Sequence, residues 1–257
     1  MRILALGDIV GHVAIDYLAE KLWAFRAQNK IDFCVANGEN ATEIRGISAT
    51  DAEDIFGTGV DLITLGNHAF GMKDIYSYLD ANEHSIIRPA NYPTDAPGVG
   101  YTIFGVNGWR VLCINVSGRV YLDPLASPFE TVDRILDRES GRYDMALLDI
   151  HAEATSEKLA LAHSFDGAVQ IMFGTHTHVP TADARVLPKG SGYITDLGMC
   201  GPENSIIGTD VQAVLRRFRT HLPTHFTVAD GPIAASGALF DVDPDTKRAR
   251  LVKLIQF

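Results

Sequence analysis

The chain has 257 residues, of which 46% are hydrophobic and 21% charged, an ordinary composition for a soluble globular protein. A formal charge of −10 at pH 7 argues against an extended nucleic-acid-binding face, although it leaves room for a small nucleotide held at a metal centre. No run approaches the ~20 apolar residues of a membrane span, and the apolar run after Met1 is too short for a signal peptide, so we expect a cytoplasmic protein.

Strands and helices are predicted to alternate through the first third of the chain. Apolar runs of strand length cover residues 2–6, 31–36 and 62–65. Helices are expected at 12–29, at 48–56 behind a serine cap, and at about 72–82. This alternation indicates a mainly parallel sheet at the core.

The remainder of the chain begins with an irregular, proline-bearing stretch at 85–100. Strands at 101–104 and 109–116 flank Asn107-Gly108, which indicates a hairpin turn. The further predicted strands are 145–151, 168–173, 184–187 and 192–196, the helices are 129–138, 155–164 and 211–220, a glycine-containing loop covers 197–208, and the strands 239–242 and 250–255 form a closing hairpin. No linker divides the chain, so we predict one domain over residues 1–257.

Five of the predicted strands end in residues that bind metals. They are followed or closed by Gly7-Asp8, by Asn37-Gly38-Glu39-Asn40, by Gly66-Asn67-His68, by His151, and by Gly174-Thr175-His176-Thr177-His178. In the last segment, two histidines two residues apart in an extended chain would project to the same side. Ligands of layered α/β proteins bind beyond the carboxyl ends of the strands, so these ends together predict a metal site.

The predicted ligands are carboxylates, amides and imidazoles, which suit Mn, Fe or Zn better than Ca. They are Asp8, Glu39, Asn40, Asn67, His151, His176 and His178. Seven ligands exceed the need of one tetrahedral ion but suit two ions that share a carboxylate, ~3.5–4 Å apart. With a bridging hydroxide such a centre carries a charge of about +1, which would attract a phosphodiester monoanion.

Each of these residues also has an ordinary explanation when it is considered alone. His151 would serve as a hydrogen-bonded core histidine, Asp8 as a helix cap, and Asn67 as a turn residue. The metal interpretation depends on the set, because five strand ends in succession deliver the required residue types.

Taken together, the motifs resemble those of the calcineurin-like metallophosphoesterases. The superfamily pattern of Gly-Asp, Gly-x-Asn, Gly-Asn-His, a later His and Gly-His-x-His is matched by the five segments that carry the predicted ligands. Within the superfamily the chain is similar to the bacterial YmdB-like family, described as 2′,3′-cyclic-nucleotide 2′-phosphodiesterases. The closer similarity lies in segments 7–11, 37–41, 151–158, 174–178 and 193–199, so it spans nearly the whole chain.

The resemblance implies an α/β fold of the αββα sandwich type, two mixed sheets flanked by helices. It also implies two transition-metal ions, Fe or Mn in the first place and Zn as a further candidate. One ion would be held by Asp8, Glu39, Asn40 and His178, and the other by Glu39, Asn67, His151 and His176. Most superfamily members have a histidine where this chain has Val10, and Asn40 would replace that ligand. His68 would stay free of the ions and act as the general acid.

The expected activity is hydrolysis of 2′,3′-cyclic nucleotides to 3′-phosphates by a metal-bridging hydroxide, with 3′,5′-cyclic nucleotides as a second class. Two alternatives remain open: a phosphomonoesterase or nuclease with the same centre, and a regulatory protein that binds nucleotide but turns over slowly. The expected partner is a small cyclic nucleotide, with no membrane and no extended nucleic-acid face. The closing hairpin and residues 85–100 are candidate surfaces for a homo-oligomer.

Overall fold

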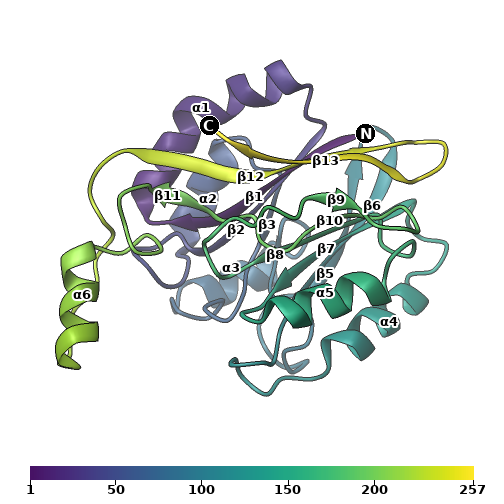
Figure 1. Ribbon diagram of the computed structural model, residues 1–257. Helices are drawn as coiled ribbons and strands as arrows, with labels where there is room; N and C mark the ends of the chain where they lie inside the picture. The colour runs from purple at the N-terminus through teal and green to yellow at the C-terminus, as the bar shows by residue number, and fades with distance from the viewer.

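The computed structural model describes residues 1–257 as two β-sheets and six helices (Figure 1). In chain order the elements are β1 (Arg2–Val10), α1 (His12–Asn29), β2 (Phe33–Asn40), α2 (Ala49–Gly57), β3 (Leu62–Thr64), α3 (Ile75–Ala81), β4 (Ile86–Ile87), β5 (Tyr101–Val106), β6 (Trp109–Ser117), α4 (Pro128–Arg138), β7 (Met145–His151), α5 (Thr155–Ser164), β8 (Ile171–Thr175), β9 (Arg185–Val186), β10 (Gly192–Ile194), β11 (Met199–Pro202), α6 (Val211–Thr220), β12 (Ile233–Val242) and β13 (Ala249–Gln256).

Both sheets mix parallel and antiparallel strands. The larger has the strand order β13-β12-β11-β1-β2-β3-β4, and the smaller has the order β5-β6-β7-β8-β10-β9. Strands β1, β2 and β3 run parallel in one sheet, and β6, β7 and β8 run parallel in the other. The carboxyl ends of these parallel strands carry the predicted site residues.

The two sheets pack face to face, and helices cover the outer face of each. Alternate residues of β1 show the arrangement: Ile3 is buried between the sheets, whereas Leu4 is buried beneath α1 and α2. In β7, Leu147 lies between the sheets and Leu148 lies beneath α4 and α5. Burial on both faces explains why these strands read as continuous apolar runs. The predicted αββα sandwich is therefore confirmed.

Several predicted elements have the bounds that the sequence indicated. Helices α1, α5 and α6 and strand β7 match their predicted residues. The side chain of Ser48 caps α2 by accepting a hydrogen bond from the backbone N–H of Asp51. Asn107 and Gly108 both have positive φ, 49° and 85°, which is the backbone of a type I′ hairpin turn.

The strands predicted at 2–6 and 31–36 end too early. Strand β1 continues to Val10 and β2 continues to Asn40, because Asp8 pairs with Met199 of β11 and Val10 pairs with Asn40. Register shifts on both sides of Asp8 bend the ladder at this point. The loop predicted at 197–208 contains β11, the irregular stretch at 85–100 contains β4, and β8 lies further along the chain than the strand predicted at 168–173.

Helix α6 stands away from the sandwich, as Figure 1 shows at the left of the view. Val214 is its buried residue, and Phe218 is 72% exposed. No helix of the protein has the length and apolar character that crossing a membrane requires.

Candidate metal centre

Four predicted ligands meet around one ring nitrogen of His151, which is fully buried at the end of β7. Its Nε2 lies 2.9 Å from Glu39 Oε1, 2.9 Å from Asn67 Oδ1 and 3.1 Å from His176 Nδ1. One ring nitrogen either donates one proton or accepts one, so it cannot hydrogen-bond well to three neighbouring atoms at once. The convergence is therefore the arrangement expected of a ligand set for a cation.

A second group of ligands contains two buried oxygens without a hydrogen-bond partner, Asp8 Oδ1 and Asn40 Oδ1. The amide nitrogen of Asn40 donates to the carbonyl of Ile44 at 2.9 Å, which fixes the orientation of its oxygen. His178 Nε2 lies 3.7 Å from the unpaired oxygen of Asp8. A buried oxygen with no partner is costly, and a bound cation would satisfy both atoms.

The tautomer of His178 is set by the chain itself. Its Nδ1 lies 2.9 Å from the carbonyl oxygen of Ile207, which can only accept, so Nδ1 carries the proton. Nε2 is then the nitrogen with a free lone pair, and it faces Asp8. Orientation of a histidine by a backbone carbonyl is a common feature of metal sites.

The prediction that His176 and His178 project from an extended segment is wrong. Strand β8 ends at Thr175, and the two histidines have φ values of 96° and 63°. Left-handed backbone at two residues other than glycine is uncommon and marks a constrained turn. The turn sends the ring of His176 towards His151 and the ring of His178 towards Asp8, one to each group of ligands.

His68 lies beside the ligands with its side chain 30% exposed. Its backbone N–H donates to Glu39 Oε2 at 2.8 Å, and its ring Nδ1 lies 3.4 Å from Asn40 Nδ2. Burial lowers the pKa of the His68 ring. Among the four histidines of the predicted site, His68 has the most exposed side chain.

The electrostatics of the first group are dominated by an ion pair. Burial disfavours the charge of Glu39, but the neighbouring His151 and His68 lower the pKa of Glu39 to about 2. Burial likewise opposes the charge of His151, but Glu39 and two aspartates raise the pKa of His151 to about 9. These shifts favour the charged pair in the absence of metal, so metal binding would have to displace a proton from His151.

A buried shell of polar residues supports the ligands from behind. Thr175 Oγ1 lies 2.9 Å from His151 Nδ1 and donates to Asp149 Oδ1 at 2.8 Å. Lys158 is fully buried, donates to the carbonyl of Thr175 at 2.8 Å and pairs with Asp196 at 2.7 Å. None of these four residues was predicted to have a role, although 158, 175 and 196 lie within the segments that carried the family resemblance.

Close packing also explains one glycine of the site. A Cβ at Gly66 would lie 2.2 Å from His151 Nε2, so no side chain fits there. The structure therefore joins all eight predicted residues in one network of contacts at the edge of both sheets. The donor atoms around His151 and the two unpaired oxygens of Asp8 and Asn40 have the chemistry of cation ligands.

The chain is similar to known proteins over nearly its whole length. A family model described as YmdB-like protein matches residues 4–255. The 2′,3′-cyclic-nucleotide 2′-phosphodiesterase of Bacillus subtilis is 42% identical over 255 residues, which cover 99% of this chain and 96% of that protein.

Two solved structures have the same fold over nearly their full length. A hypothetical protein from Thermus thermophilus superposes with a TM-score of 0.93 at 39% identity, covering 100% of this chain and 99% of that one. A phosphatase from Mycoplasma pneumoniae superposes with a TM-score of 0.94 at 33% identity, covering 100% and 93%. The resemblance drawn from the motifs is confirmed, and the protein belongs to the YmdB-like family.

Proposed function

We propose that this protein is a metal-dependent phosphodiesterase that opens 2′,3′-cyclic nucleotides to 3′-phosphates. The observation that carries the proposal is the pair of buried, unpaired oxygens on Asp8 and Asn40, next to the ligand set around His151. The activity of the Bacillus subtilis relative supports the choice of substrate.

The residues divide into two ligand sets that share Glu39. Asp8, Asn40 and His178 would complete one set, and Asn67, His151 and His176 the other. When bound, Fe or Mn ions (or Zn) supply positive charge that attracts the phosphodiester and lowers the pKa of water at neutral pH. The charge of Glu39 lies close enough to Asp8 to raise the pKa of that carboxyl further, after burial has raised it.

His68 is proposed to protonate the leaving oxygen. Opening the ring breaks the bond between phosphorus and the 2′ oxygen, and that oxygen must gain a proton as a water oxygen joins phosphorus. The backbone bond from His68 to Glu39 holds the ring beside the ligands while leaving it partly open to solvent. A lowered pKa makes the protonated ring a stronger acid towards the departing oxygen.

The test is product analysis after Mn-loaded protein is incubated with 2′,3′-cyclic AMP. We expect adenosine 3′-phosphate from the wild type and no product from His176→Ala. His163→Ala is the matched control, because His163 is exposed on α5 and should leave turnover unchanged. A 2′-phosphate product, or no turnover by protein that has bound metal, would contradict the proposal. Parallel incubations with a phosphomonoester and short RNA test the two other substrate classes.

A further inference from the structure

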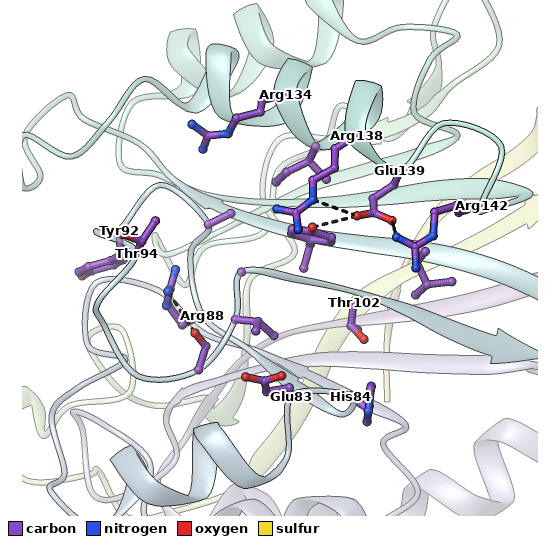
Figure 2. Close-up of a pocket in the computed structure, with 17 residues that line it drawn as sticks. Glu83, His84, Arg88, Tyr92, Thr94, Thr102, Arg134, Arg138, Glu139 and Arg142 are labelled. Carbon is purple, nitrogen blue, oxygen red and sulfur yellow. Dashed lines mark hydrogen bonds and ion pairs between the residues drawn. The ribbon is translucent and has the colours of Figure 1, made fainter.

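A cavity of about 920 Å³ is lined by residues of the smaller sheet and its neighbouring segments. It is bounded by α4, by the edge strand β5, and by the segment 83–100, as Figure 2 shows. None of the proposed metal ligands lines it. Its volume is in the range of pockets that bind small molecules, roughly 300–1,000 Å³.

The charge of this cavity is opposite to that of the protein. Four arginines line it, Arg88, Arg134, Arg138 and Arg142, against the carboxylates of Glu83 and Glu139. The formal charge of the whole chain is −10. In Figure 2 the side chains of Arg134 and Arg138 lie on the side of α4, whereas Glu83 lies across the opening from them. An excess of arginine in an acidic protein marks a surface that favours an anion.

Glu139 forms ion pairs with two of these arginines. Its side chain is 4% exposed, and its carboxylate accepts a hydrogen bond from Tyr101 Oη at 2.9 Å. Arg142 Nη1 lies 2.8 Å and Arg138 Nε lies 3.7 Å from the same carboxylate. A guanidinium has five N–H donors, so both arginines keep donors for a ligand. One carboxylate also leaves one of the two positive charges uncompensated.

Arg88 adds a buried charge with no carboxylate beside it. It is 5% exposed, and its guanidinium donates to the backbone carbonyls of Pro89, Ala96, Pro97 and Gly98. These hydrogen bonds stabilise the loop at residues 89–98 but do not neutralise the positive charge of Arg88. Burial lowers the pKa of the Arg88 guanidinium. Arg134 lies on the α4 side of the cavity and forms no ion pair in the structure. A bound anion would therefore offset positive charge on both sides of the cavity.

We infer that this cavity is a second binding site, for a phosphate-bearing metabolite the size of a nucleotide. Arginine forms paired, charge-assisted hydrogen bonds with phosphate oxygens, which suits the cluster on α4. The cavity is far larger than inorganic phosphate, and the rings of Tyr92 and Tyr101 offer flat surfaces for a base or sugar. The inference concerns binding alone and does not depend on the proposed hydrolysis.

The experiment is calorimetric titration of Mn-loaded, full-length protein with adenosine 3′-phosphate. Because the metal centre would also bind this probe, His176→Ala is titrated beside the wild type, and it should retain the cavity site. The double variant Arg134→Glu/Arg138→Glu should weaken that site by at least about tenfold. The control Arg216→Glu/Arg219→Glu reverses two exposed charges on α6 and should leave the affinity unchanged.

A second variant, Arg134→Glu alone, guards against misfolding because this exposed side chain has no partner to lose. It should also weaken binding, and raising the salt concentration should do the same in the wild type. The inference is overturned if His176→Ala protein does not bind the probe, or if both α4 variants bind it as the wild type does. Equal affinity for inorganic phosphate would overturn the assignment of a nucleotide-sized ligand.

Discussion

Asn40 is one of the proposed metal ligands, in place of the histidine that the resemblance leads us to expect at the position of Val10. The amide nitrogen of Asn40 donates to the carbonyl of Ile44, and this bond fixes the orientation of the amide. The amide oxygen is then buried without a hydrogen-bond partner. We expect Asn40→Ala to lower the metal content from two ions to about one per chain. The loss of affinity should exceed the ~10–100-fold that removal of a ligand's supporting partner produces.

Elemental analysis of the purified protein measures this prediction. Asn204→Ala is the control, since Asn204 is exposed and its side chain has no hydrogen bond in the structure. Two ions per chain in Asn40→Ala protein would show that Asn40 is not a ligand.

The role proposed for His68 makes a different prediction, because its ring is not counted among the metal ligands. His68→Ala should retain its metal and lose ~10²–10⁴-fold in kcat on a cyclic nucleotide. The loss should be much smaller on bis(p-nitrophenyl) phosphate, whose leaving group departs without a proton. Steady-state kinetics on the two substrates decide the matter. An equal loss on both would assign His68 to positioning instead of acid catalysis.

The ligand types were predictable from the sequence because each lies at the end of an apolar run. Their orientation was not predictable, because it depends on contacts between distant segments. The carbonyl that selects the tautomer of His178 belongs to Ile207, in a loop far along the chain. The left-handed backbone at His176 was not predictable either, since histidine adopts positive φ more often than most residues but still does so in a small minority of cases.

At the scale of elements, the segment that follows β3 and the end of β7 are packed so closely that a methyl group does not fit between them. Gly66→Ala would place a Cβ 2.2 Å from the metal-facing nitrogen of His151. We expect a loss of ~1–3 kcal/mol in the free energy of unfolding, together with loss of metal. Urea unfolding and elemental analysis measure both. Gly105→Ala, where a Cβ meets no neighbour, is the control, and matching results for the two variants would refute the packing argument.

A side-chain pair joins α1 to α2. His12 Nδ1 lies 3.0 Å from Asp51 Oδ1, and this hydrogen bond raises the pKa of His12. Asp16 and Asp54 face the same ring and add to the rise. Because the pKa is higher in the folded state, the stabilisation is present below the unfolded value of about 6.5. It disappears as pH rises through the folded value.

His12→Gln should therefore be less stable than the wild type at pH 5.5, and the difference should vanish at pH 8.5. The ring is 55% exposed, so solvent screening limits the difference to about 0.5 kcal/mol or less. Urea unfolding at the two pH values measures it. A difference that is the same at both would mean that the charge of His12 has no part in joining the helices.

Element types were more predictable than element ends. Helices α1 and α6 matched their predicted bounds, α6 with the side chain of Asp210 as its cap and α1 without a side-chain cap. Strands β1 and β2 extended into polar residues, since pairing with β11 overrides the local preference of Gly7 and Asn37 for turns. Such pairing is a tertiary effect, and a single strand's composition does not reveal it.

For the whole molecule, stability should depend on the layer between the sheets far more than on the protruding α6. Phe173 is 1% exposed in that layer, and Phe173→Ala should cost ~3–5 kcal/mol. Phe218 is 72% exposed on α6, and Phe218→Ala should change stability by less than ~0.5 kcal/mol. Urea unfolding of both variants measures the contrast. A comparable cost at Phe218 would mean that α6 is covered in solution.

Strand β1 lies in the interior of the larger sheet, between β2 and the strands β11 and β12. Residues 2–6 pair with β12, and the amino group of Met1 donates to the carbonyl of Val242 at 2.8 Å. Strand β1 is therefore synthesised long before β12, the strand with which it pairs. At ~5–20 residues per second, synthesis of 257 residues takes roughly 10–50 s. Until β12 has been made, β1 keeps an open edge, and an unpaired strand edge is prone to pairing with another chain.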